Sequence, residues 1–268
     1  MERAARRERT SRRAQGVAFF EKVIRLLQRD PSKLLQIGPS FVLYKLRKAI
    51  TSPVAFRIVS RRHWYFTLND HQYRYFYHPF NETWRNERCV ELPIIREEVE
   101  KVDAERVLEF GNVLSHYYPV YHDIVDKHEK GDGVINSDIV DFQTPKVYDL
   151  IVSISTIEHV GFNEEKYVQN ETVLQPEKPL HVIHKLKGML SQKGKCIVTM
   201  PVGYNPVLDR LLEEDDGTLF TYRYYLKRIS RSNRWVETKK EDIHNTKYGF
   251  PFLSANVLAI YVFECQYT

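Results

Sequence analysis

The stretch YDLIVSISTIEHVG, Tyr148 to Gly161, decides the fold class. Its first half is a nearly continuous apolar run from Leu150 to Ile154, which is typical of a strand buried on both faces. Its second half is polar and ends in Glu158 and His159, whose side chains can titrate or form hydrogen bonds. A buried strand that ends in such a pair predicts a functional site at its carboxyl end.

The composition is that of one globular domain with an extension. The chain has 268 residues, which is long enough to bury one substantial core. Its charged fraction of 28% is ordinary, and its aromatic fraction of 13% is too high for a disordered protein. Its three cysteines lie far apart in apolar stretches, with neither metal-ligand nor disulfide-framework spacing, so we expect reduced core residues and no metal site. The sequence has no apolar run of about eighteen residues and no signal-peptide pattern. We therefore expect a cytoplasmic protein that is soluble or at most peripheral.

The net charge of +5 is concentrated near the N-terminus, where six of the first thirteen residues are arginine. Apolar residues then recur with helical spacing over residues 17–27 and 41–50, which predicts two basic amphipathic helices. The arginine run is either a solvated terminus or a contact for an anionic partner. The helices either cover the domain or lie on a membrane surface. We expect no specific nucleic-acid contact, and a peripheral membrane contact stays open.

An aromatic segment follows. HWYFTLNDHQYRYFYH, residues 63–78, alternates aromatic and polar residues around Asn69 and Asp70, which predicts a β-hairpin. RCVELPII, residues 88–95, is interpreted as another strand. The aromatic side chains can either stack on a base or sugar or pack as a small hydrophobic layer against the main domain. Residues 78–88 between them form either a binding loop or a surface turn.

From about Ala104 onward, strands and helices alternate, which indicates a doubly wound α/β sheet. We expect strands over residues 106–110, 123–126, 133–139, 150–155 and 196–200, with a helix over 180–190 and a turn at SQKGK. Late strands, the last of them antiparallel, follow from Tyr222 onward. The sequence thus divides into an N-terminal extension, 1–103, and an α/β domain, 104–268, whose ligands are expected at the carboxyl ends of the strands.

Five motifs in this order resemble the class I S-adenosylmethionine-dependent methyltransferases, which have a Rossmann-like, mostly parallel sheet. They are VLEFGN at 107–112, IVDK at 124–127, SDIVDF at 137–142, the stretch quoted first, and LKGMLSQKGKCIVTMPVG at 186–203. The resemblance covers residues 107–206. It implies S-adenosyl-L-methionine as the cofactor and methyl transfer as the reaction.

The resemblance also implies which residues meet the cofactor. Glu109 acts on its ammonium group or orients the loop, and Gly111 leaves space for the methionine moiety. Asp126 follows Glu109 by seventeen positions and accepts hydrogen bonds from both ribose hydroxyls. Asp138 accepts from the adenine amino group. The remaining residues expected at the cofactor are Asn112, Ile139, which packs on the adenine ring, and Ser153.

Two features depart from the family pattern. The first motif has one glycine, Gly111, and Asn112 takes the place of a second, because asparagine tolerates the left-handed backbone conformation. Residues 126–133 are too few for a helical crossover. The adenine end of the pocket is therefore either open or covered by the N-terminal extension. With these changes a catalytically silent domain becomes the alternative to an enzyme.

Glu158 and His159 are expected to position and deprotonate an acceptor hydroxyl, because histidine titrates near neutral pH. The string Glu-His-Val-Gly is also similar to cyclopropane fatty-acid synthases. The alternative is that Glu158 caps a helix and His159 packs under the cofactor. Tyr204 and Asn205 follow the fifth strand and are expected to contact the acceptor. The predicted function is O-methylation of a small-molecule or glycan-type acceptor, and the alternative is a silent binding or membrane-surface assembly module.

Overall fold

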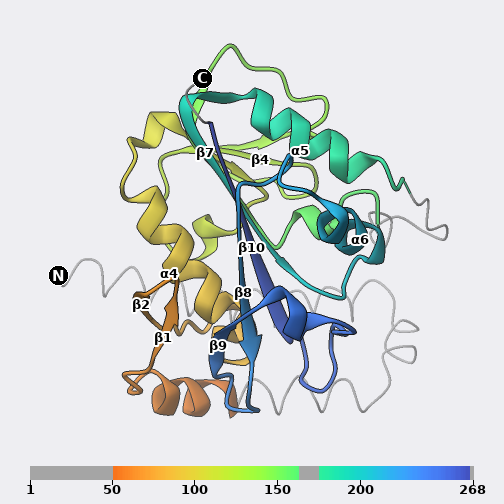
Figure 1. Cartoon of the computed structure of the whole chain (residues 1–268). Coiled ribbons are helices and arrows are strands. Elements are labelled where there is room, and N and C mark those ends of the chain that lie inside the picture. The colour runs from red at the N-terminus through yellow and green to blue at the C-terminus, as the bar shows by residue number, and fades with distance from the viewer. Residues whose placement is uncertain (1–50, 163–174, 266–268) are drawn as a thin grey trace, which may run out of the picture. The chain divides into compact units, whose positions relative to one another are not determined.

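The computed structural model describes residues 51–162 and 175–265 (Figure 1). The chain divides into two compact units, residues 1–55 and 56–268, and the second unit contains every element discussed below. The predicted helices over 17–27 and 41–50 and the N-terminal arginine run lie outside the described residues. None of the helices that the structure describes has the length and apolar composition needed to cross a membrane.

The centre of the second unit is an eight-stranded sheet. Its strands lie in the order β5 (Val134–Asn136), β4 (Asp123–Asp126), β3 (Val107–Phe110), β6 (Tyr148–Ile154), β7 (Leu190–Pro201), β10 (Val257–Glu264), β8 (Tyr222–Arg228) and β9 (Trp235–Thr238). The first five strands are parallel, and β10 runs antiparallel to both of its neighbours. This is the predicted doubly wound Rossmann-like sheet with a late antiparallel strand, and the strand order reverses between β3 and β6.

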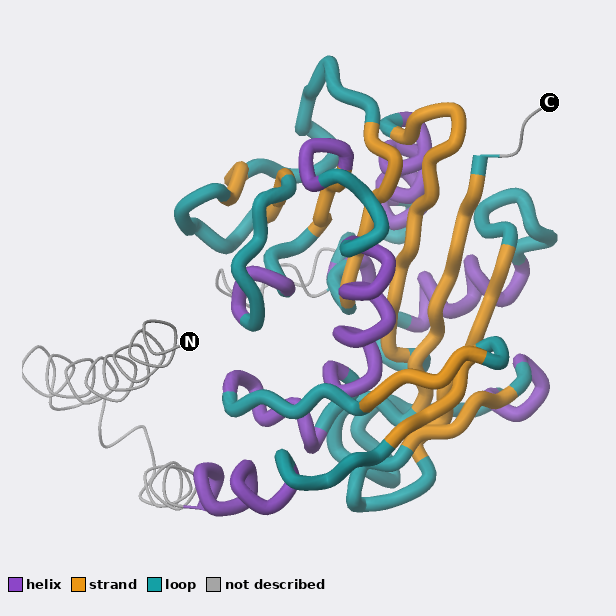
Figure 2. The backbone as a smooth tube through the Cα atoms, turned by 90° about the vertical axis from the view of Figure 1, so that its left-hand side faces the viewer, coloured by secondary structure: helices purple, strands orange, loops and turns teal. Residues whose placement is uncertain are grey.

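The residue pattern explains why these strands are buried on both faces. Alternate residues of β3, β6, β7 and β10 belong to two different hydrophobic clusters, one on each side of the sheet. One cluster includes residues of α5 (Lys178–Gly188) and α6 (Pro206–Glu214), and the other includes residues of α4 (Arg88–Val99). Figure 1 shows α4 on one side of the sheet and α5 on the other. Figure 2 follows the same strands in orange between helices in purple.

The prediction of a strand over residues 88–95 is wrong, because this stretch lies in α4. Cys89, Val90, Leu92, Ile94 and Ile95 are all buried, since the helix packs between the sheet and the hairpin and has little solvent-exposed surface. Such a helix has no clear apolar stripe, and its short apolar run is indistinguishable from a strand in the sequence.

Pro93 lies inside α4 and has no N–H to donate to the carbonyl of Cys89. That carbonyl instead accepts a hydrogen bond from the backbone N–H of Phe76, at 2.9 Å, where the chain leaves the hairpin. The proline therefore leaves a helix carbonyl available to a neighbouring segment. This bond joins α4 to the aromatic segment.

The predicted hairpin is confirmed. β1 (Tyr65–Leu68) pairs with β2 (His71–Arg74), and Asn69 and Asp70 in the turn both have positive φ, 50° and 58°, as a tight hairpin turn requires. Phe66, Leu68 and Tyr75 belong to the same hydrophobic cluster as Val107 of β3. Of the two interpretations, the aromatic residues that face inward form a hydrophobic layer on the main domain. This layer crosses the predicted boundary between residues 103 and 104.

The connection from β4 to β5 follows the sequence-based expectation, because residues 127–133, all of which the structure describes, contain no helix. The predicted turn at SQKGK is wrong, because these residues belong to the start of β7. They instead form a bulge in the pairing of β6 with β7, since Leu190 pairs with Tyr148 whereas the next paired residue is Lys195. The short link from β4 to β5 leaves that corner of the sheet covered only by a loop.

If the hairpin is part of the main core, Phe66→Ala should lower the free energy of unfolding by about 3–5 kcal/mol, because the side chain is 3% exposed. Denaturant unfolding should remain a single transition. Tyr65→Ala is the matched control on the outer face of the same strand and should change stability by about 0.5 kcal/mol or less. A separate early transition in the Phe66 variant would show that the hairpin folds independently.

Candidate functional site

The carboxyl ends of β3, β4, β5 and β6 surround a small cavity of about 60 Å³. This is the position at which open α/β sheets bind ligands, beside the reversal of strand order. Four of the residues predicted from the sequence meet there, namely Asp126, Asp138, Ile139 and His159. Phe110, Lys127, His128, Thr156 and Val160 complete the lining.

Glu109 lies at the base of the loop that follows β3 and is fully buried. Its Oε1 accepts hydrogen bonds from the backbone N–H groups of Val113 and Leu114, both at 2.8 Å. Its Oε2 lies 2.9 Å from Nε2 of His122, which is also buried. Both carboxylate oxygens are engaged within the protein, so Glu109 orients the loop. The sequence analysis missed His122, although its position directly before β4 places it beside the end of the loop.

Gly111 begins this loop with φ +89°, a backbone conformation that favours glycine. A Cβ atom at this position would lie 2.2 Å from Oγ1 of Thr156, which follows β6. The sequence analysis assigned the space beside Gly111 to a ligand. In the structure Thr156 fills it, so the glycine is required by the approach of two strand ends.

Asp126 ends β4 and fixes the loop that replaces the missing crossover helix. Its Oδ1 accepts from the backbone N–H groups of His128 and Glu129, at 2.8 and 2.6 Å. Its Oδ2 accepts from the backbone N–H of Asn112, at 3.0 Å, and so ties the β3 and β4 loops together. The Asn112 side-chain oxygen accepts from the hydroxyl of Ser115. Three charge-assisted hydrogen bonds thus hold both loops at the cavity.

Asp138 follows β5 and lies between two lysines. Its Oδ2 is 3.1 Å from Nζ of Lys127 and 3.0 Å from Nζ of Lys178. Partial burial acts to raise the pKa of Asp138, but the Val140 N–H and the two ammonium groups lower it below its ordinary value. Asp138 is therefore an ionised group. Ile139 beside it is almost completely buried and gives the cavity an apolar wall.

Glu158, just past β6, is buried, and its Oε2 has no hydrogen-bond partner among the described residues. Burial raises its pKa well above the ordinary value, and the charges of Glu91 and Glu87 raise it further, whereas its own backbone N–H and Arg88 oppose the shift. The carboxyl group therefore holds its proton at higher pH than an ordinary glutamate. Its Oε1 is 3.9 Å from Nε2 of His159.

His159 stands at the edge of the cavity with its side chain 53% exposed. Its Nδ1 lies 3.1 Å from the hydroxyl of Tyr204, and the two rings meet edge to face. Tyr204 in turn contacts the ring of Tyr248 edge to face, with ring centroids 5.0 Å apart. The fold thus brings Tyr204, from the segment after β7, into contact with His159.

Asn205 is buried, and both ends of its side-chain amide are engaged. Its Nδ2 donates to the backbone oxygen of Glu158, at 3.0 Å, and its Oδ1 accepts from the N–H groups of Val207 and Leu208 at the start of α6. Asn205 therefore caps the helix and fixes the segment that contains Glu158. Ser153 is fully buried inside β6, and its Oγ has no hydrogen-bond partner among the described residues.

Glu91 of α4 holds the end of β6, and the sequence analysis missed it. Its Oε1 accepts from the hydroxyls of Ser155, at 2.6 Å, and Thr199, at 2.7 Å, while its Oε2 lies 2.5 Å from Nη1 of Arg88. Ser155 has φ +39°, which is rare for a residue with a side chain. The spacing of Arg88 and Glu91, three positions apart, would have indicated an ion pair if the segment had been assigned as a helix.

The chemistry of the cavity suits a nucleoside, because carboxylates can accept from hydroxyl or amino groups and apolar walls can hold a base. The volume of about 60 Å³ is too small for a nucleoside, since small-molecule pockets typically have volumes of about 300–1,000 Å³. The side chains of Lys127 and His128 line the cavity, and both residues are exposed at the surface. Room for a nucleoside requires these two side chains to move, which for Lys127 breaks its ion pair with Asp138.

No family model and no curated protein matches the chain. It is similar to the solved structure of the N-methyltransferase NodS from Bradyrhizobium japonicum with S-adenosylhomocysteine, with 14% identity over 66% of this chain and 86% of that chain and a TM-score of 0.40. A possible histamine N-methyltransferase from Thermotoga maritima gives 12% identity, coverages of 65% and 89%, and a TM-score of 0.37. An rRNA methylase from Streptococcus thermophilus gives 9% identity over 65% of this chain and 96% of that chain, with a TM-score of 0.37.

These solved structures are described as methyltransferases, the same family that the sequence motifs resemble. Identities below 25% and TM-scores below 0.5 carry no argument about what this chain binds or does. Its function must be inferred from its own residues.

Gly111→Ala should destabilise the protein by more than about 3 kcal/mol, because it adds a clash with Thr156 to the cost of about 1–2 kcal/mol for a left-handed backbone. Gly133→Ala is the control, since Gly133 has φ +81° with no atom near a Cβ, and should show the backbone cost alone. Thr156→Ala should rescue part of the Gly111→Ala defect in the double variant, measured by chemical denaturation. Equal effects of the two glycine substitutions would contradict this packing.

Proposed function

We propose that this chain is an S-adenosylmethionine-dependent methyltransferase that binds its cofactor at the carboxyl ends of β3, β4, β5 and β6. One observation carries the proposal: Asp126, Asp138, Ile139 and His159, predicted from separate motifs, line one cavity at the reversal of strand order. The link from fold to reaction is an analogy, because the same sheet supports many functions. The convergence of these residues adds support that the topology alone does not give.

The cofactor supplies a methyl group activated by an adjacent positive sulfur. In the proposed complex, Asp126 accepts from a ribose hydroxyl with the one lone pair of Oδ2 that its three backbone donors leave available. Ile139 packs against the adenine, and Asp138 accepts from the adenine amino group. Glu109 keeps the first loop in place from below.

We propose an oxygen atom as the methyl acceptor, in a small molecule or a glycan. His159 is the candidate general base, because its side chain is 53% exposed at the cavity and the hydroxyl of Tyr204, 3.1 Å from Nδ1, orients the ring. Burial raises the pKa of Glu158 and so favours its neutral form, and a neutral carboxyl group does not stabilise a protonated imidazole as a carboxylate would. Tyr204 is positioned to orient both the histidine and an acceptor.

The second candidate function is a catalytically silent domain that serves as a binding or assembly module. Two observations favour it: the cavity has a volume of only about 60 Å³, and Asp126 and Asp138 already have donors within the protein. Cofactor binding separates the two candidates. A peripheral membrane contact through the basic N-terminus stays a prediction.

Isothermal titration calorimetry with S-adenosylhomocysteine should detect binding to the full chain. Asp126→Asn should weaken it by about 1–3 kcal/mol, because an amide forms weaker hydrogen bonds with hydroxyl donors than a carboxylate does. Asp132→Asn changes an exposed acid in the same loop and is the matched control. Absence of binding to the wild-type chain would reject the enzyme and favour the silent module.

His159→Ala should reduce turnover on an identified acceptor by roughly 10²–10⁴-fold and leave S-adenosylhomocysteine affinity nearly unchanged. His159→Gln, which keeps hydrogen-bonding capacity without basicity, should rescue little. His181→Gln changes an exposed histidine on α5 and is the control. Wild-type turnover in both His159 variants would mean that the histidine has a packing role only.

A further inference from the structure

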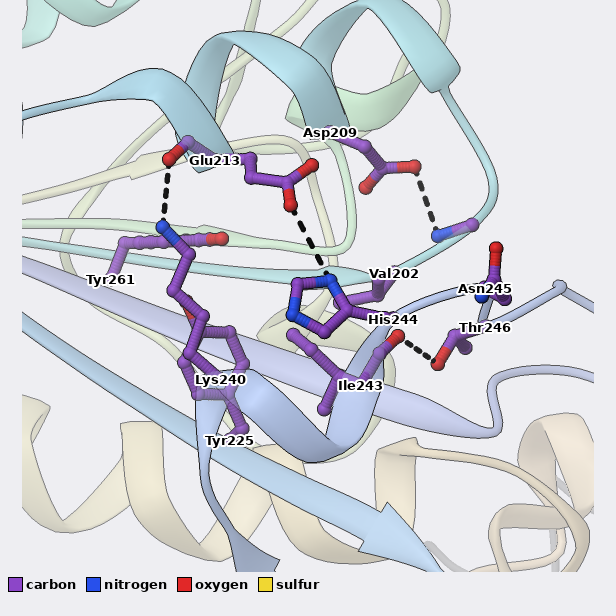
Figure 3. A pocket seen from close by; sticks show the side chains of 11 residues that line it. Val202, Asp209, Glu213, Tyr225, Lys240, Ile243, His244, Asn245, Thr246 and Tyr261 are labelled. Carbon is purple, nitrogen blue, oxygen red and sulfur yellow. Dashed lines mark hydrogen bonds and ion pairs between the residues drawn. The ribbon is translucent and has the colours of Figure 1, made fainter.

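A second cavity lies outside the proposed cofactor site, between α6 and the short helix η6 (Lys240–Ile243), and Figure 3 shows its lining. Its volume is about 150 Å³. Tyr225 of β8 and Tyr261 of β10 contribute aromatic groups from the sheet. The space equals about five water volumes of ~30 Å³ each, which is about the size of one small ring.

Two carboxylates on successive turns of α6 face this cavity. Asp209 is mostly buried, and its Oδ2 accepts from the backbone N–H of Gly203, at 2.9 Å, while the described residues give its Oδ1 no donor. Burial raises the pKa of Asp209 to about 6, with a smaller contribution from the charge of Glu213. Glu213 is more exposed and lies at the rim. Oδ1 of Asp209 is thus an acceptor available to a ligand.

Hydrogen-bond donors line the opposite wall. The ammonium of Lys240 donates to the backbone oxygen of Glu213, at 2.7 Å, and its other N–H bonds can reach a ligand. Nδ1 of His244 lies 3.5 Å from Oε1 of Glu213. Asn245 adds an amide, whereas the hydroxyl of Thr246 already donates to the backbone oxygen of Ile243, at 2.6 Å, and can only accept from a ligand. Two acids therefore face a lysine and a histidine, so the lining holds groups of both signs of charge.

These properties define the chemistry of an occupant. A strongly charged ligand would face repulsion from one half of this set, whereas a neutral ring with several hydroxyl groups can both donate to carboxylates and accept from an ammonium. The cavity also adjoins the proposed acceptor site through the chain itself. Gly203 lines it, and the next residue, Tyr204, hydrogen-bonds to His159.

We propose that this cavity binds one neutral sugar ring, whose hydroxyl groups donate to Asp209 and Glu213 and accept from Lys240. Within the proposed function, on which this assignment of substrate class rests, the ring would belong to a glycan whose neighbouring unit reaches His159. Sugar binding itself needs neither the cofactor nor the reaction.

Saturation-transfer NMR on the full chain, with glucose, galactose, mannose and N-acetylglucosamine in the absence of cofactor, tests the proposal. We expect at least one sugar to bind, and Asp209→Asn and Lys240→Met each to weaken it by roughly tenfold. Glu214→Gln and Lys239→Met, which change exposed neighbours outside the lining, should leave affinity unchanged. Melting temperatures of all variants identify any loss of folding, and Glu213→Gln is a second acid variant at the exposed rim, where misfolding is least expected.

Three outcomes would overturn the proposal. They are no binding of any of the four sugars, equal binding by the lining variants and their controls, and preference for spermidine or Mg²⁺ over every sugar. The proposed methyltransferase function is tested separately, by calorimetry with S-adenosylhomocysteine. Sugar binding without cofactor binding would support the cavity assignment and reject the enzyme.

Discussion

The buried carboxylate of Glu91 is the interaction on which the arrangement of this protein depends. It joins α4 to the ends of β6 and β7 through the hydroxyls of Ser155 and Thr199, and Arg88 balances its charge. A buried charge is tolerated only when it is paired and hydrogen-bonded, so these contacts fix one geometry for all three elements. Because Ser155 directly precedes the segment with Glu158 and His159, the position of the candidate site follows from this contact.

A second set of hydrogen bonds fixes the other half of the site. Glu109 and Asp126 end adjacent parallel strands, and each uses its carboxylate to hold backbone N–H groups of a loop. Backbone donors in a loop need such partners when no helix or strand supplies them. The same acids that a sequence motif assigns to cofactor binding therefore also maintain the loops. A cofactor that binds as proposed would have to share the oxygen atoms of Asp126 that hold these loops.

Polar groups near the carboxyl ends of the parallel strands line two neighbouring cavities. The cavity at β3 to β6 has carboxylates, apolar walls and an accessible histidine, whereas the cavity at α6 has two acids, a lysine and aromatic groups. The segment from Val202 to Asn205 lies between them, since Gly203 lines one and Tyr204 contacts His159 of the other. A ligand with a nucleoside part and one with hydroxyl groups would meet at this segment.

The sequence by itself determined the α/β sheet, the hairpin and the strand ends that carry acids, because buried parallel strands appear as apolar runs and Asn69-Asp70 fits a tight turn. It did not determine α4, whose burial on most faces removes the helical pattern. Only the tertiary structure decided that Thr156 fills the space at Gly111, that Glu91 holds Ser155 and that Tyr204 reaches His159. These contacts join residues between 45 and 64 positions apart, and local sequence patterns carry no information about packing over such distances.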